Sequence, residues 1–158
     1  MSTPQSRSST AALAAILAVC AVPWIAVPNG ASDVTFVMSW GLVNTNPWHV
    51  LSLSEYLGAT RGFETLPWSL QVWPISLGFY IGAVASAAGG VLIDREDPRL
   101  TVGLLVLSGV GSTMVWQGLL GRGSIEAVPM GVVATGAIVW WFYWPALRRF
   151  GKSGRQSE

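Results

Sequence analysis

The sequence predicts an all-α membrane protein with four transmembrane helices and a short extracytoplasmic cap between the first and second helices. Three observations lead to this fold class. The chain has 158 residues, of which 51% are hydrophobic and only 11% are charged, whereas soluble domains average about 25% charged residues. All nine basic and eight acidic residues lie outside four apolar stretches. Each stretch is long enough to cross a hydrocarbon layer of about 30 Å, and they cover approximately residues 10–27, 68–93, 100–120 and 128–147.

The first stretch, residues 10–27, predicts a retained membrane span. A cleaved signal peptide is the alternative, because Arg7 precedes the apolar run and small residues follow it. The run is longer than the usual signal-peptide core of about 7–15 residues, and Trp24 lies close to where cleavage would occur. Cys20, the one cysteine of the chain, is expected to pack as a small apolar residue.

The segment 29–66 is expected to lie on the helices as an outer cap. Without a disulfide it is too short to fold as an independent domain. Ser52 and Glu55 have the spacing of a capping box, which predicts a short interfacial helix. The apolar runs 36–38 and 40–43 are expected to dip into the headgroup layer.

The second stretch, residues 68–93, carries a small residue at every fourth position. Such a stripe allows a second helix to approach closely. Packing within the chain is favoured over packing between chains, and both interpretations are open. Pro67 is expected to start this helix and Pro74 to kink it. The helix-packing stripe consists of Gly78, Gly82, Ser86 and Gly90.

Proline and acidic residues predict where the last two helices begin. Asp97 and Pro98 suit the N-cap and first position of the third helix, and Pro129 can start the fourth. The aromatic run 140–144 is interpreted as an interfacial belt, with a ligand cage as the alternative.

The basic residues predict the orientation in the bilayer. When the chain is cut at the four stretches, one side carries seven basic residues and the other carries Arg61 and Arg122. Because positive charge collects on the cytoplasmic side, both termini, including the tail 148–158, are expected to face the cytoplasm of the cell membrane.

The outer cap holds the best candidate for a polar site. Asn44, Asn46 and His49 lie close together in sequence, and the charged residues Glu55, Arg61 and Glu64 follow in the same cap. A functional interpretation makes His49 a proton-exchanging or metal-binding group oriented by a carboxylate. The alternative is that these residues form turns and sit at the interface. No catalytic residue, metal ligand or cofactor is assigned.

The function expected from these features is that of a non-enzymatic packing or accessory subunit of a larger membrane assembly. The four stretches hold no ionisable residue, which argues against proton transport by one copy and against haem ligation. A net charge of +1 argues against a nucleic-acid partner. The expected partners are the lipid bilayer and other membrane subunits, or further copies of the chain. A homo-oligomeric channel or carrier is the alternative, and a membrane enzyme using the cap residues is a weaker one.

Three segments resemble a family of small haloarchaeal integral membrane proteins without an assigned function. They are the runs at 40–47 and 95–99 and the aromatic-basic run at 140–149. The resemblance implies an archaeal cell membrane and four helices. It implies no activity and no catalytic residues.

Overall fold

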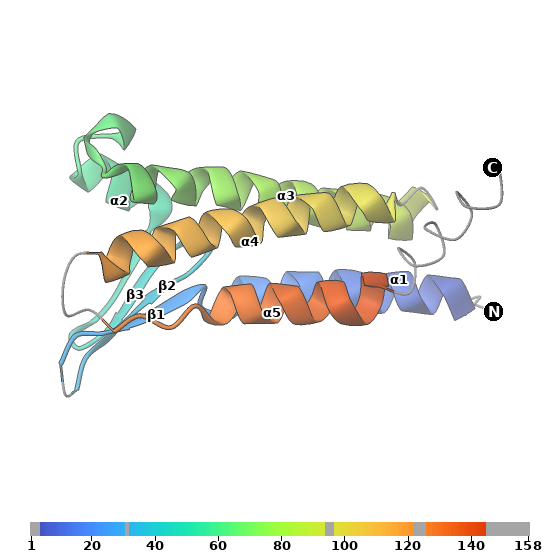
Figure 1. Cartoon of the computed structure of the whole chain (residues 1–158), viewed down its shortest axis with the longest axis horizontal. Coiled ribbons are helices and arrows are strands. Elements are labelled where there is room, and N and C mark those ends of the chain that lie inside the picture. The colour runs from blue at the N-terminus through green and yellow to red at the C-terminus, as the bar shows by residue number, and fades with distance from the viewer. Residues whose placement is uncertain (1–3, 31, 94–96, 122–125, 145–158) are drawn as a thin grey trace.

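The computed structural model describes residues 4–30, 32–93, 97–121 and 126–144. Over these residues the protein has an α/β fold, in which five helices carry a four-stranded antiparallel sheet at one end (Figure 1). The predicted all-α fold with four transmembrane helices is therefore wrong. Among the described residues, two helices rather than four are long and apolar enough to cross a bilayer.

The helices differ greatly in length. The α-helices are α1 (Pro4–Ala18), α2 (Leu53–Ala59), α3 (Trp68–Ile93), α4 (Pro98–Leu120) and α5 (Met130–Ile138). Short 3-10 turns cover Val19–Ala21 and Phe63–Thr65, and a π-helix at Val139–Tyr143 continues α5. Helices α3 and α4 are the two candidate spans, whereas α1 and α5 contribute only shorter apolar segments.

The first predicted span, 10–27, ends early because Pro23 interrupts it. The helical turn stops at Ala21, and Val22 is extended, with φ −86° and ψ 130°. A residue before proline is disfavoured in the helical region, so the chain leaves the helix there. The apolar residues that follow form strand β1, Ile25–Pro28, instead of a last helical turn.

The remaining strands lie in the predicted cap. Strands β2 Val34–Val37, β3 Gly41–Thr45 and β4 Trp48–Ser52 follow β1 in spatial order, and each pairs antiparallel with the next. Their β-branched and aromatic residues suit a pleated sheet. Pairing also satisfies the backbone N–H and C=O groups of these segments within the protein itself. The predicted headgroup dips at 36–38 and 40–43 are therefore largely strand.

The fourth predicted span, 128–147, also begins differently. Val128 forms a β-bridge with Ala26, through backbone hydrogen bonds of 2.9 and 3.0 Å. This bridge covers the free edge of β1. Helix α5 begins only at Met130, immediately after Pro129.

Two helix starts follow the local signals in the sequence. Ser52 caps α2 with a complete capping box, because its side chain accepts from the Glu55 backbone N–H and the Glu55 side chain accepts from the Ser52 backbone N–H. Asp97 caps α4, and Pro98 is its first residue. Both predictions are confirmed.

The core joins the sheet to the helices. Helices α3 and α4 pack against each other along their lengths. Helix α1 packs on α3 and α5 packs on α4, so that α1 and α5 form a second pair below the first in Figure 1. The Tyr80 hydroxyl on α3 donates a hydrogen bond of 2.7 Å to the Ile16 carbonyl on α1. The Trp73 indole on α3 donates a hydrogen bond of 3.0 Å to the Met38 carbonyl, just after β2. Both aromatic residues are buried.

Candidate functional site

The predicted polar residues of the outer cap cluster at the hairpin between β3 and β4. Asn44 and His49 are register partners across this hairpin, so their side chains lie next to each other on one face of the sheet. Asn46 and Pro47 form its two-residue loop, and their peptide bond is cis. The structure therefore brings together three of the six predicted cap residues.

A chain of hydrogen bonds continues this polar row across the sheet. Thr35 on β2 donates a hydrogen bond of 2.8 Å to the Asn44 side-chain oxygen. Asn29, just after β1, donates a hydrogen bond of 2.6 Å to the Thr35 hydroxyl. Neither Asn29 nor Thr35 was predicted. The sequence signal for them is their alternation with apolar residues, which can be interpreted only once the strands are paired.

Asp33 anchors the tip of the β3–β4 hairpin. Its carboxylate accepts hydrogen bonds from the Asn46 backbone N–H, at 3.2 Å, and from the Thr45 hydroxyl, at 3.3 Å. The Thr45 hydroxyl in turn accepts a hydrogen bond of 2.8 Å from the Val34 backbone N–H. The Asp33 carboxylate, which lies beside Asn46, is therefore occupied by hydrogen bonds that stabilise the loop. This residue was also missed from the sequence.

The other predicted charged residues do not complete a catalytic arrangement with His49. The Glu55 carboxylate is held by Ser52, with hydrogen bonds of 2.6 Å to its hydroxyl and 2.8 Å to its backbone N–H. These two contacts lower the pKa of Glu55, burial opposes them, and the charge of His49 lowers it slightly further. Arg61 and Glu64 are exposed beyond α2.

The inner face of the sheet and the ends of the long helices enclose a small cavity of about 220 Å³. Strand residues Val27, Thr35 and Leu42 line one wall, and Leu70 and Leu119 line the other. Of the polar side chains that line it, Asn29 and Thr35 are hydrogen-bonded to each other, and the Trp73 indole is hydrogen-bonded to the Met38 carbonyl. The cavity is therefore a mainly apolar pocket at the junction of sheet and helices.

The face of the sheet turned away from the helices is apolar as well. Ala26, Phe36, Val43 and Val50 are register partners on successive strands, so they form one row across the whole sheet. We call this row the outer sheet face. Its residues lie outside the buried core, and Val50 is 44% exposed. Antiparallel sheets commonly present a polar face to water on one side, so an apolar face here is unusual.

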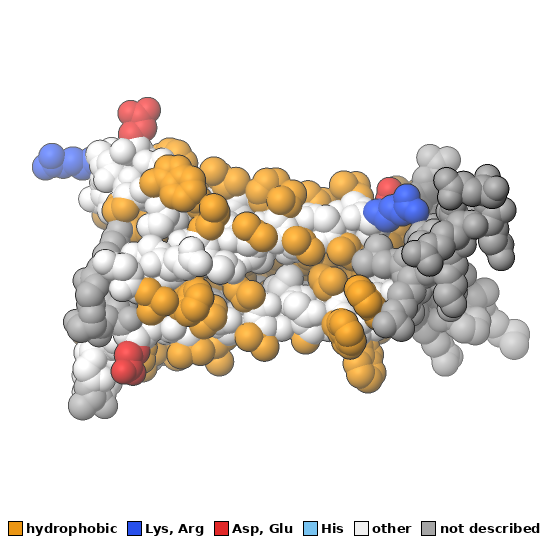
Figure 2. Space-filling model, in the orientation of Figure 1, with side chains coloured by type: hydrophobic (Ala, Val, Ile, Leu, Met, Phe, Trp, Pro, Cys, Tyr) orange, Lys and Arg blue, Asp and Glu red, His pale blue; other side chains and the backbone are white. Residues whose placement is uncertain are grey.

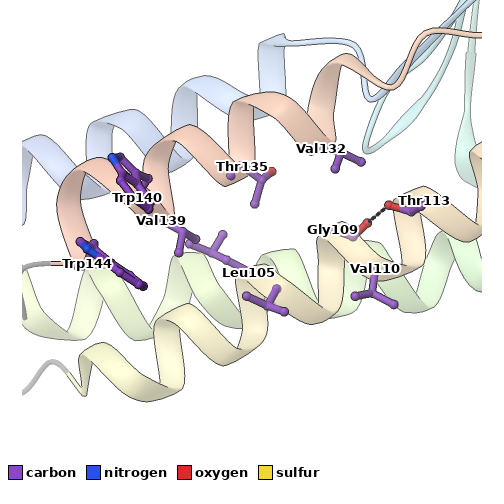
Figure 3. Close-up of a pocket in the computed structure, with 11 residues that line it drawn as sticks. Leu105, Gly109, Val110, Thr113, Val132, Thr135, Val139, Trp140 and Trp144 are labelled. Atoms are coloured by element: carbon purple, nitrogen blue, oxygen red, sulfur yellow. Dashed lines mark hydrogen bonds between the residues drawn. The ribbon is translucent and has the colours of Figure 1, made fainter. Parts of the chain in front are cut away.

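A third feature is a groove of about 340 Å³ between α4 and α5 (Figure 3). We call it the α4–α5 groove. Its walls are almost entirely apolar, and two glycines, Gly109 and Gly136, widen it. One end is closed by Trp140 and Trp144, whose rings stack with centroids 5.0 Å apart. The remaining lining residues are Leu105, Val106, Val110, Thr113, Val132, Thr135 and Val139.

The predicted packing stripe on α3 has mixed surroundings. A Cβ at Gly78 would meet no atom within 4 Å, and one at Gly82 would touch the Leu104 side chain at 3.4 Å. The Ser86 hydroxyl shares a hydrogen bond of 2.8 Å with Thr101 on α4, and Gly90 is buried. The tightest contacts between the two helices lie elsewhere, at Gly111 and Gly118 of α4.

No group of three metal-ligating side chains is found within the described ranges of the chain. A family model described as a domain of unknown function, DUF8050, matches residues 1–153. No curated protein and no solved structure matches the chain. Because the family model spans nearly the whole sequence, the chain belongs to the DUF8050 family.

Proposed function

We propose that the protein is a non-enzymatic accessory subunit of a larger membrane assembly, and that it contacts another subunit through the outer sheet face. In this proposal the α3–α4 hairpin crosses the cell membrane, the shorter apolar helices α1 and α5 lie alongside it in the membrane, and the sheet lies on the extracytoplasmic side. The observation that carries the proposal is the apolar row of Ala26, Phe36, Val43 and Val50, in which Val50 is exposed and the described part of the chain only half-buries the other three.

The exposure of the long helices supports a membrane location. At 1.5 Å per residue, α3 is about 39 Å long and α4 about 35 Å, against a hydrocarbon core of about 30 Å. Only 28% of the most apolar window of each helix is buried. A core helix of a soluble protein would be mostly buried. Large exposed apolar side chains such as Ile81 and Val110 suit contact with lipid.

The distribution of charge agrees with this location. On the face shown in Figure 2, hydrophobic side chains are spread along the helices, and the visible charged side chains lie near the two ends. The sheet lies beside the start of α3 and the end of α4, the end that carries few basic residues in the sequence. The positive-inside rule therefore favours an extracytoplasmic sheet.

The outer sheet face supports a role as a subunit. Fully burying an exposed side chain such as Val contributes up to roughly 1.5–3 kcal/mol. Val50 is exposed and the other three side chains are already half-buried, so covering the row gains most at Val50 and less at the others. Strand β4 is also the free edge of the sheet, since Val128 covers only the β1 edge. A partner can therefore approach both the face and the edge.

Two neighbouring residues of β4 allow a matched test. Val50 lies on the outer sheet face and His49 on the opposite face, and both are exposed. In native membranes solubilised with a mild detergent, we expect the wild-type protein to migrate in a complex with a second subunit in fixed stoichiometry. Val50→Asp should release that subunit, because it places a charge in an apolar interface. His49→Asp should keep the complex.

The outcome distinguishes three cases. If both variants keep the complex, the outer sheet face is not its interface. If the wild-type protein migrates as a single chain, the subunit proposal is wrong. If the complex contains only further copies of this chain, the accessory role is replaced by a homo-oligomer, the arrangement that a channel or carrier would use.

A further inference from the structure

We propose that the α4–α5 groove binds one hydrocarbon chain of an anionic membrane lipid, with the headgroup at the end formed by Trp140 and Trp144. The inference rests on the membrane location proposed above, because only then does the groove lie within the lipid.

The size of the groove fits a single lipid chain. If one methylene takes up about as much space as a water molecule, about 30 Å³, the volume of about 340 Å³ holds about eleven carbons. Eleven carbons joined by bonds of about 1.5 Å extend over about 14 Å. The groove runs from Leu105 to Thr113 along α4, about 12 Å, and from Val132 to Trp144 along α5, about 18 Å. Volume and length therefore agree.

A transmembrane helix fits the same space poorly. A helical segment about 10 Å wide and 12 Å long occupies roughly 900 Å³, which is well above the volume of the groove. Only side chains of such a helix could enter the groove. A flexible hydrocarbon chain can follow it over its whole length.

Apart from the two indoles, the lining offers few polar groups to a ligand, and they are the hydroxyls of Thr113 and Thr135. The Thr113 hydroxyl donates a hydrogen bond of 2.8 Å to the Gly109 carbonyl of its own helix, as the dashed line in Figure 3 marks. Its hydrogen is therefore not available to a ligand. The other labelled side chains that point into the groove are mostly aliphatic or indole. A lipid hydrocarbon chain can cover such a surface as well as protein side chains can.

The tryptophan end of the groove suits the headgroup region. Tryptophan rings gather where hydrocarbon meets headgroups. Trp140 lies within the π-helix Val139–Tyr143, and Trp144 follows it directly. In the sequence, the side of the bilayer assigned to this end carries seven basic residues and four acidic ones. This excess of basic residues favours an anionic headgroup.

Two pairs of glycines make the test specific. A Cβ at Gly109 or Gly136 would meet no protein atom within 4 Å, so Gly109→Leu/Gly136→Leu is expected to narrow the groove while the backbone keeps its position. Gly78→Leu/Gly103→Leu adds the same side chains at two exposed positions that are equally open and do not line the groove. The protein is reconstituted in vesicles of phosphatidylcholine and phosphatidylglycerol that contain a phosphatidylglycerol with a photoreactive diazirine on its chain.

Labelled peptides are then mapped by mass spectrometry. We expect labelling to concentrate on Val110 and Val139 and to fall by about tenfold in Gly109→Leu/Gly136→Leu, the change expected when about two methylenes lose their contacts. The control pair should label like the wild type. Even labelling around α3 and α4, or equal labelling in both variants, would overturn the lipid site. Flotation of the vesicles distinguishes failure of the lipid site from failure of the membrane location. A protein that does not float with the vesicles contradicts the membrane location itself.

Discussion

Short polar contacts decide the conformation of single residues in the cap. Three hydrogen bonds join Ser52 and Glu55 at the start of α2, and Asp33 holds the β3–β4 loop through Asn46 and Thr45. The first contact joins residues three positions apart and is visible in the sequence. The second joins residues 13 positions apart, so only the folded sheet reveals it.

Ser52→Ala is expected to raise the pKa of Glu55 towards its ordinary value. The Ser52 side chain is the largest cause of the lowered pKa, and the variant removes it. Because the folded-state pKa lies below the unfolded one, the ionised carboxylate stabilises α2 above the ordinary carboxylate pKa. This contribution is lost as the pH falls through the folded-state pKa.

An NMR titration of the Glu55 side-chain carboxyl carbon measures this effect. Ser54→Ala is the matched control, because the Ser54 hydroxyl contacts Ser52 but has no hydrogen bond with Glu55. The same Glu55 pKa in the wild type and in Ser52→Ala would contradict the assignment of the capping box as its cause.

Close packing of α3 against α4 governs the structure at the level of elements. Gly118 and Gly111 of α4 lie against Ser69 and Ser76 of α3, and a Cβ at either glycine would overlap the facing serine. Near the other end, the hydroxyls of Ser86 and Thr101 join the two helices. Small residues therefore set the distance between the helices, as is typical of helices that associate in lipid.

Gly118→Ala is expected to lower the stability by about 1–3 kcal/mol, the usual cost of overpacking. The new methyl would overlap both the hydroxyl and the Cβ of Ser69, and no rotamer of the serine removes the second overlap. Gly103→Ala on the same helix meets no atom within 4 Å and should be neutral or slightly stabilising. Unfolding of both variants by denaturant in detergent micelles gives the comparison. Equal stability would show that α3 and α4 can separate at no cost.

The arrangement of the whole molecule separates its polar parts. The sheet and α2 lie at one end of the long helices, and the start of α1 lies at the other (Figure 1). On the face shown in Figure 2, hydrophobic and uncharged groups lie between these ends, and no charged side chain is visible there. A bilayer that covers this middle region would leave the polar ends in water on its two sides.

Cysteine labelling tests the proposed orientation. In a Cys20→Ala background, Gly58→Cys places a thiol on the exposed helix α2, where a Cβ meets no other atom. Ser153→Cys places one in the tail that is predicted to be cytoplasmic. A membrane-impermeant maleimide should label Gly58→Cys in intact cells, and Ser153→Cys only after permeabilisation. The reverse pattern would invert the orientation, and labelling of both in intact cells would refute it.

The sequence by itself determined the features that depend on neighbouring residues or on a long apolar run. It predicted α3 with the bounds 68–93, α4 to within two residues, the capping box of α2 and the Asp97–Pro98 start of α4. Each of these needs only a local signal, because a helix forms its hydrogen bonds within one segment.

Only the tertiary structure decided the sheet and what it brings together. Strands of four or five residues cannot be told from short helical segments by apolarity alone. Each strand makes its hydrogen bonds with another segment, so the sequence of one strand alone does not determine the register in which it pairs. For this reason Ile25–Val27 was interpreted as the end of a helix, and Asp33 was overlooked. The outer sheet face, with its row from Ala26 to Val50, exists only because four separate segments pair in this register.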